Sequence, residues 1–444
     1  MKTIIAAVFG MAALTASAET GISGVIVRQQ WPWNGKVNID YILTGEEGSQ
    51  HDIAVTLRNG SSVITNEYGS LSGDLIGVTP GARRIVWDPA YPTNKSPSYA
   101  EALMVNFSAT LSTAEDDNTY MIVDLSKGTS ATSENPYPIS FMSAPPAGGW
   151  TDEYKTDKLV LRRIPAGTAV LGSPDEPDGG EIGRVAKWET QRKTTFTNSF
   201  YMAVFETTNK QFEKVMGYNA AVGLERGGGD KLPAVGENYH LLRGTNTVKG
   251  ASALASEVWP GHEATSFFGV LNSRLPADVL SAAGLGDYEM ELPTVSQWEY
   301  ACRAGTTGAW NNGTTITNST TDANAELLAQ YVGSTYWQVA LEVGGKVSNA
   351  YGLYDMHGNV AEICRDKYMD TNDALWSGSD QVEPLIHNTT AYNPNVLACG
   401  GSRYSNSNAT TVRSSSMRIV SPSLAGNKAE NVKYGFRIAL TRKR

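Results

Sequence analysis

The sequence predicts an α+β protein of two domains, an N-terminal β-sandwich followed by a loop-rich domain of short helices and strands. Residues 24 to about 143 show the two-residue alternation of antiparallel strands, whereas the chain from about Lys158 shows short, well-capped helices between glycine-rich loops. A length of 444 residues also exceeds what one ordinary hydrophobic core contains, so two domains are expected.

The first residues, MKTIIAAVFGMAALTASAET, have the layout of a secretory signal peptide. Lys2 gives a positive start, an apolar run reaches to about Leu14, and the small residues 16–18 form a cleavage site. The alternative is a membrane anchor, but this run is shorter than the roughly 20 residues that a spanning helix needs. We therefore expect residues 1–18 to be removed, with no membrane insertion afterwards, and the protein to be secreted, periplasmic or on the cell surface.

Residues 19–143 are expected to form the β-sandwich. Between Val37 and Leu43 apolar side chains occupy every second position, and similar runs occur at 53–57 and 103–107, with Asn-Gly turn signals at 34–35 and 59–60. His51 stands alone here and is expected on the surface, and the segment offers no catalytic constellation. Such an exported module is typical of a spacer or an adhesion domain.

A proline- and glycine-rich stretch, SAPPAGGWTDEYK at 143–155, has the composition of a linker. We place the linker at residues 144–157 and the second domain at residues 158–444.

Helix signals recur in the second domain. Thr208 with Gln211 and Thr294 with Gln297 form capping boxes, and Gly217 and Gly305 follow the two helices. A third helix is expected from near Ser266 to Leu275, ending at Pro276. Cys302 falls on the same helix face as Trp298, which favours a buried structural thiol over a reactive one.

Six segments of the second domain together resemble the formylglycine-generating enzyme (sulfatase-modifying factor) domain family. They are IPAGTAVLGSPDE (164–176), FYMAVFETTNKQF (200–212), LPTVSQWEYACRAGT (292–306), NAYGLYDMHGNVAEIC (349–364), GGS (400–402) and YGFRIAL (434–440). The resemblance covers about 285 residues, leaves the first 155 outside, and implies a compact mixed α/β variant of the C-type lectin fold.

The stretch DMHGNVAE, residues 355–362, offers an oxygen-only set of ligands that suits a hard cation such as Ca²⁺. The resemblance implies calcium ligands at Asp355, Gly358, Val360 and Glu362. The alternative is that these carboxylates cap a turn and pair with nearby arginines. His357, inside the motif, has no partner at metal-ligand spacing and is expected to pack or hydrogen-bond.

The resemblance also implies that two cysteines, five residues apart after the GGS turn, bind copper and perform the oxidation in the active enzymes. The matching positions here are Ser405 and Thr410, whose hydroxyls give no thiolate for a soft metal. We therefore expect no copper and no catalytic residue; an active protein would be a formylglycine-generating oxidoreductase acting on a sulfatase cysteine. The cysteines are Cys302, Cys364 and Cys399, whose pairing the sequence leaves open. Two thiols together at the mouth of the site would overturn this expectation.

The terminal stretch SRYSNSNATTVRSSS, residues 402–416, is instead predicted to bind a ligand. Its tyrosine, serine and asparagine content is typical of adaptable recognition surfaces. The candidate binding residues are Arg403, Tyr404, Asn406, Asn408 and Thr410. Arg413 and Arg437 are expected to fix the loops through structural hydrogen bonds or ion pairs.

The expected partner is an unknown protein, peptide or glycan. The formal charge of −9 argues against a nucleic-acid or anionic-membrane binder, because both need basic patches. Two further alternatives stay open. The terminal segment could be diversified by a retroelement system, since several of its residue types are reachable by mutating adenines in an asparagine codon, or the protein could be a structural surface component without a ligand.

Overall fold

The computed structural model describes both halves of the chain. The described residues are 20–29, 36–45, 51–59, 62–63, 70–75, 78–88, 107–114, 118–175, 180–219, 229–236, 238–244, 261–331, 340–368, 380–385, 395–403, 408–421 and 433–443. The expected signal peptide and the positions Tyr404, Ser405 and Asn406 lie outside them. Within these ranges no helix is both long and apolar enough to cross a bilayer.

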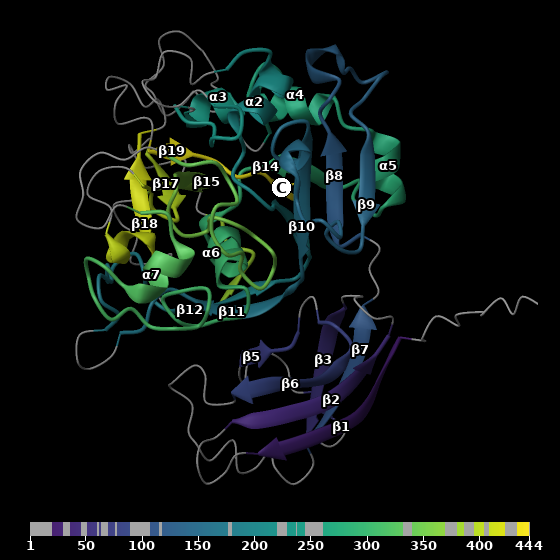
Figure 1. Cartoon of the computed structure of the whole chain (residues 1–444), viewed down its shortest axis with the longest axis vertical. Helices are drawn as coiled ribbons and strands as arrows, with labels where there is room; N and C mark the ends of the chain where they lie inside the picture. The colour runs from purple at the N-terminus through teal and green to yellow at the C-terminus, as the bar shows by residue number, and fades with distance from the viewer. Residues whose placement is uncertain are drawn as a thin grey trace, which may run out of the picture.

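Two antiparallel sheets form the N-terminal part, drawn in purple and blue in Figure 1. One has the order β1 (Gly21–Gln29), β2 (Val37–Thr44), β6 (Gly81–Asp88), β5 (Ser70–Gly73), and the other the order β4 (Ser62–Val63), β3 (Asp52–Asn59), β7 (Phe107–Ala114). The alternation expected in β2 is confirmed, because Val37, Ile39, Tyr41 and Leu43 are buried and the residues between them are not. The expected run at 103–106 lies outside the described residues.

The apolar faces of β2, β3 and β6 share one buried cluster, which joins Ile39 and Ile85 to Ile53. His51 belongs to this interior and not to the surface where we expected it, since only 5% of it is exposed. Its backbone exchanges hydrogen bonds of 2.9 and 2.8 Å with Val78. Local sequence patterns do not predict this bridge, because Val78 lies 27 positions further along the chain.

The main sheet of the C-terminal part has six antiparallel strands in the order β14, β20, β13, β10, β8, β9. Their bounds are β8 (Tyr120–Asp124), β9 (Ile139–Met142), β10 (Lys158–Ile164), β13 (Phe200–Ala203), β14 (Tyr288–Glu291) and β20 (Ala439–Arg442). The last strand of the chain therefore lies inside this sheet, between β13 and β14.

Strands β8 and β9 belong to the main C-terminal sheet, although they lie within residues 19–143, which are expected to form the β-sandwich before a linker at 144–157. Strand β8 pairs with β10 from Asp124↔Lys158 to Tyr120↔Arg162. Within the expected linker, Trp150 packs edge-on against Tyr120 at 5.1 Å. Alternation predicts a strand but not its neighbour, so the C-terminal unit begins by Tyr120, well before residue 158.

Two smaller sheets complete the C-terminal part. One has the order β18 (Met417–Val420), β17 (Val396–Cys399), β15 (Ala361–Lys367), β19 (Tyr434–Gly435), and the other the order β11 (Gly167–Leu171), β12 (Arg192–Phe196), β16 (Gln381–Val382). The first of these sheets carries both the loop before β15 and the turn after β17, which are the two segments that the sequence marks as functional.

The expected helices are present. Their bounds are α2 (Asn209–Met216), α3 (Tyr239–Arg243), α4 (Phe267–Ser273), α5 (Ala277–Ala282), α6 (Val295–Arg303) and α7 (Ala323–Leu328). Both capping boxes are confirmed at Thr208 and Thr294, and Gly217 ends α2 in the left-handed conformation with φ 82°. The third expected helix is confirmed as α4, which Ser266 caps and which ends before Pro276, and Pro276 is itself the N-cap of a further helix, α5.

Two large buried clusters hold the C-terminal part together. One packs the main sheet against α2, α3 and α4, where the rings of Phe212 and Phe267 stack at 5.3 Å. The other surrounds α6 and contains Trp298 together with the three cysteines. Cys302 is thus a core residue on the face of Trp298, as the helix periodicity predicts.

Candidate functional site

Strand β17 ends in a turn that directs the terminal segment. Gly400 and Gly401 have φ of 84° and 69°, a conformation that side chains with a Cβ rarely adopt. A Cβ at Gly400 would also lie 3.0 Å from the ring of Trp298, and one at Gly401 would overlap the carbonyl of Thr411. Both glycines are therefore required for the chain to pass closely over α6 into the segment that follows.

The terminal segment resumes as a 3-10 helix, Ala409–Val412, which Asn408 caps. The backbone N–H of Asn408 donates to Oγ1 of Thr411 at 3.2 Å, and Oγ1 of Thr410 donates to Oδ1 of Asn408 at 2.5 Å. Beyond it, Ser414 donates from Oγ to the carbonyl of Ala309 at 3.0 Å. The small polar side chains of this stretch thus bond to their own and neighbouring backbone.

Arg413 is buried and ties the segment to the loop at residues 180–189. Its guanidinium contacts both oxygens of Glu189, at 2.8 and 2.9 Å, pairs with Glu181, and donates to the carbonyl of Gly183 at 2.7 Å. Because the side chain is 1% exposed and fully bonded, Arg413 has a structural role, as its place in the motif indicated.

Thr410 is one of the two positions that the resemblance matches to the cysteines of the active enzymes. The loop at 180–189 lies directly over it, since a Cβ at Gly183 would overlap the Thr410 side chain. Gly183 has φ 82°, so both space and conformation require glycine there. The other position, Ser405, lies outside the described residues. Sequence patterns did not reveal this covering loop, because Glu181, Gly183 and Glu189 are distant in the chain.

Among the candidate binding residues, Arg403, Asn408 and Thr410 are described, and all three are partly exposed. The backbone N–H of Arg403 donates to the carbonyl of Asn359 at 2.8 Å, which joins the binding segment to the candidate calcium loop. Partial burial lowers the pKa of the Arg403 guanidinium. A partly desolvated guanidinium is suited to a planar anionic or carbonyl partner.

Glu362, one of the expected calcium ligands, is held by a buried arginine. Arg437 donates to Oε1 of Glu362 at 2.6 Å and to Oε2 at 2.9 Å, and the indole Nε1 of Trp298 donates to Oε2 at 2.7 Å. These contacts match the alternative to calcium binding, in which the carboxylate pairs with a nearby arginine. Glu362 therefore does not fit a ligand role.

Asp355 is placed differently. One of its oxygens accepts the backbone N–H of Gly344, while Oδ1 is buried without a hydrogen-bond partner among the described residues. Burial raises the pKa of Asp355. Glu206, which no sequence motif marks as a site residue, lies in the same region, and burial and the charges of Asp355 and Glu362 raise its pKa well above the usual value. In their ionised forms these two carboxylates would exceed the charge of the single paired arginine, so a bound cation would favour ionisation by offsetting their charge.

The calcium loop thus fits a cation only in part. Asp355 offers a free oxygen, and Glu206 uses its two oxygens to accept from the N–H of Val360 at 3.1 Å and from Nδ2 of Asn359 at 2.5 Å. Gly358 and Val360 bring backbone carbonyls to the same loop. His357 is not a candidate ligand, because Nδ1 bonds the carbonyl of Val412 at 2.7 Å and Nε2 accepts from the N–H of Asn311 at 3.2 Å.

Two of the thiols are neighbours. Sγ of Cys364 on β15 lies 3.8 Å from Sγ of Cys399 on β17, and both residues are buried. They lie inside the cluster around α6, below the Gly400-Gly401 turn, and not at the mouth of a pocket formed by residues 402–416. Burial raises the pKa of both thiols, so neither carries a thiolate at neutral pH.

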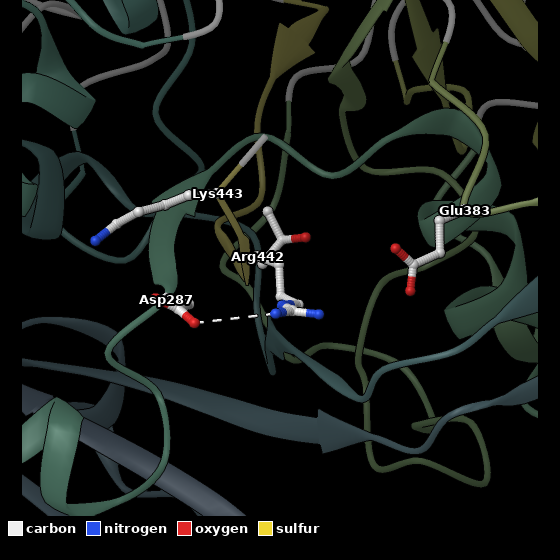
Figure 2. Close-up of a pocket in the computed structure, with 5 residues that line it drawn as sticks. Asp287, Glu383, Arg442 and Lys443 are labelled. Carbon is white, nitrogen blue, oxygen red and sulfur yellow. Dashed lines mark ion pairs between the residues drawn. The ribbon is translucent and has the colours of Figure 1, made fainter.

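A separate cavity of about 250 Å³ opens beside β20 and is lined by none of the site residues described above; Figure 2 shows its charged lining residues. Its lining includes two acidic residues, Asp287 and Glu383, and two basic residues, Arg442 and Lys443, with 3.9 Å between the carboxylate of Asp287 and the guanidinium of Arg442. Glu383 already accepts from Thr197 and Asn198, and Lys443 donates to the carbonyl of Gly286 at 3.1 Å. Each of these four charged groups therefore already has a partner within the protein, which makes this a weak candidate.

Within the described ranges, one cluster has the spacing of metal ligands, namely His262, Glu289 and Glu291. Glu291, however, already pairs with Arg243 at 2.8 Å and with Arg365 at 3.2 Å. The two arginines supply the positive charge that two carboxylates require, so this cluster is better described as a buried ion-pair network than as a metal centre.

Comparison with known proteins identifies a matching family model and similar solved structures. The model of the Sulfatase-modifying factor enzyme 1-like domain matches residues 151–442. Among solved structures, the chain is similar to Treponema denticola variable protein 1, at 22% identity and a TM-score of 0.42 over 65% of this chain and 96% of that one. It is also similar to CarF, at 15% identity and a TM-score of 0.35 over 63% and 97%. No curated protein matches the chain.

Proposed function

The chain belongs to the family of sulfatase-modifying factor enzyme 1-like domains, and from this premise we propose that it is an exported, non-catalytic binding protein. The proposed binding residues are Arg403, Tyr404, Asn406, Asn408 and Thr410. The proposed ligand is a protein, peptide or glycan. The expected signal peptide at residues 1–18 supports export, and a β-sandwich formed by the two N-terminal sheets would serve as the spacer that carries the binding domain.

The observation that carries the proposal is the position of Thr410. A threonine hydroxyl has no thiolate form and does not bind soft metals, and the loop at Gly183 packs directly onto it. Asn408 caps the 3-10 helix that contains Thr410, and both Asn408 and Arg403 are partly exposed. Partly exposed amide and guanidinium groups are suited to recognition.

The test is a glycan and peptide array probed with the full chain. Binding by the wild type that is lost in Arg403→Ala would support the proposal. Asn408→Ser should weaken the binding, although its serine side chain can still cap the 3-10 helix. Arg28→Ala is the matched control, because Arg28 is 63% exposed on the N-terminal sheet. An array without any Arg403-dependent signal would favour the alternative of a structural surface protein.

The calcium site is a further part of the proposal, in a reduced form. Asp355, together with the carbonyls of Gly358 and Val360, is the ligand set that we propose, with Glu206 as a nearby second carboxylate and with Glu362 left in its ion pair. Such an oxygen-only set suits calcium, which when bound would offset the buried negative charge and stiffen the loop that Arg403 contacts through Asn359.

Two other functions remain as alternatives. A divergent oxidase acting on a sulfatase cysteine would need an accessible thiol pair, whereas Cys364 and Cys399 are 0% and 2% exposed. A binding protein diversified by a retroelement would use the same surface as the main proposal. A near-copy of the DNA of residues 402–416 beside the gene would distinguish it, and the absence of that copy would remove it.

A further inference from the structure

The three cysteines differ in their surroundings, and only two of them face each other. In the β15–β17 ladder Glu362 pairs with Cys399, and Cys364 follows two residues later on the same strand. This brings the two Sγ atoms to 3.8 Å. The third thiol, Cys302 on α6, lies 3.9 Å from the carbonyl of Met356 and 3.9 Å from Nε2 of His357.

Closing a bond between Cys364 and Cys399 requires a modest movement. A disulfide has its sulfur atoms about 2 Å apart, so the two sulfurs must approach by roughly 1.8 Å. Both side chains already point into the same apolar cluster. The ladder is irregular between Ile363 and Lys367, so Cys364 lies where the regular pairing of β15 with β17 is interrupted.

We propose that Cys364 and Cys399 form a disulfide while the chain folds in an oxidising compartment, leaving Cys302 as the free thiol. One thiolate attacks a disulfide oxidant, which is a small-molecule or protein disulfide, and releases one reduced thiolate. The second cysteine then attacks the mixed disulfide and releases the other. The two cysteines lose two electrons and two protons, and the oxidant becomes two thiols.

The timing follows from burial. Both thiols are enclosed in the folded domain and have raised pKa values, so the folded, reduced protein is a poor substrate for exchange. The bond therefore forms before the cluster around α6 closes. The place of oxidation rests on the proposed export, whereas the pairing itself rests on the strand geometry, so a refolding experiment tests the pairing even if the export proposal fails.

The experiment refolds the reduced, denatured full chain in a glutathione redox buffer, then denatures it and alkylates the remaining thiols. The expected product has one alkylated cysteine, Cys302, and a peptide linking Cys364 to Cys399, and before alkylation it is about 2 Da lighter than the reduced chain. Three alkylated cysteines, or a link that includes Cys302, would overturn the proposal.

A second measurement uses thermal unfolding with and without a reductant. The bond closes a long loop, so reduction is expected to lower the Tm of the oxidised wild type by roughly 8 °C. Cys302→Ala should keep this reductant-dependent shift, whereas Cys364→Ala should lose it. A shift that survives in Cys364→Ala, or a wild type whose Tm ignores the reductant, would contradict the assignment.

Discussion

Arg437 and Glu362 form a buried, two-pronged ion pair, with the shortest contact at 2.6 Å between Nη2 and Oε1. The same guanidinium donates from Nη1 to the carbonyls of Ala203 and Val204, both at 3.0 Å. The pair therefore fastens β15 to the end of β13, and Trp298 attaches α6 to the same carboxylate. A residue expected to bind calcium is instead a junction of three elements.

The first prediction concerns this junction. Glu362→Gln should lower the free energy of unfolding by about 3–5 kcal/mol, because it leaves the Arg437 charge buried and unpaired. Glu153→Gln is the matched control, since Glu153 pairs with Lys158 at 2.8 Å but is 48% exposed, and it should cost under about 1 kcal/mol. Denaturant unfolding of both variants checks the contrast, and equal, small costs would show that the pair is not structural.

The second prediction concerns calcium, and it compares the Tm of each protein with and without a chelator. Any destabilisation caused by a substitution itself is then present in both measurements and cancels. A chelator should lower the Tm of the C-terminal domain, by the equivalent of about 2.7 kcal/mol if calcium was present at a hundred times its dissociation constant. Asp355→Gly should abolish this difference while tolerating the φ of 54° at that position. Adding magnesium after chelation should restore little of the lost Tm. A wild-type Tm that is unaffected by the chelator would end the calcium proposal.

The sequence predicts local structure in this protein better than it predicts which distant segments pair or pack together. The capping boxes at Thr208 and Thr294 depend on residues three apart, so short-range chemistry determines them. The assignment of β8 to the main sheet and the burial of His51 depend on contacts with distant strands, which alternation does not encode. The same holds for the site, where Gly183 covers Thr410 across more than 200 residues and no spacing rule links the two.

The proposal that the domain is non-catalytic gives the third prediction. The purified protein should bind no stoichiometric Cu(I) and should consume no oxygen with a cysteine peptide, because Cys364 and Cys399 are buried and offer copper no thiolate, whether they are protonated thiols or are joined in the proposed disulfide. Copper titration with a spectroscopic Cu(I) probe and an oxygen electrode measure both. Tight uptake of one Cu(I) that Cys364→Ser removes, and that Cys302→Ser leaves intact, would instead support the oxidase alternative.

The loop over Thr410 gives the fourth prediction, with a matched pair of glycines. Gly183 and Gly284 both have positive φ, of 82° and 73°, but a Cβ at Gly284 would meet open space. Gly284→Ala should therefore cost about 1–2 kcal/mol of backbone strain. Gly183→Ala should cost about 1–3 kcal/mol more, because it also displaces Thr410. Unfolding free energies that are equal for the two would mean that the loop does not press on the segment.

The last prediction concerns acid stability through Glu291. Burial alone would raise the pKa of this carboxyl, but the charges of Arg243 and Arg365 and the hydrogen bond from His262 lower it to about 2. Because the pKa in the folded state lies below the unfolded value of 4.5, the charged carboxylate stabilises the fold above about pH 4.5. This contribution, about 3 kcal/mol, is lost as the pH falls towards 2.

Glu291→Gln should therefore be markedly less stable than the wild type at pH 6, and the difference should shrink steadily as the pH falls from 4.5 to 2. Unfolding free energies measured at several pH values in this window check it. Glu289→Gln is the comparison, since burial raises the pKa of Glu289 and its loss should not weaken the fold at neutral pH through the same linkage. A Glu291→Gln deficit that stays constant down to pH 2 would show that the two arginines do not hold this carboxylate in its charged form.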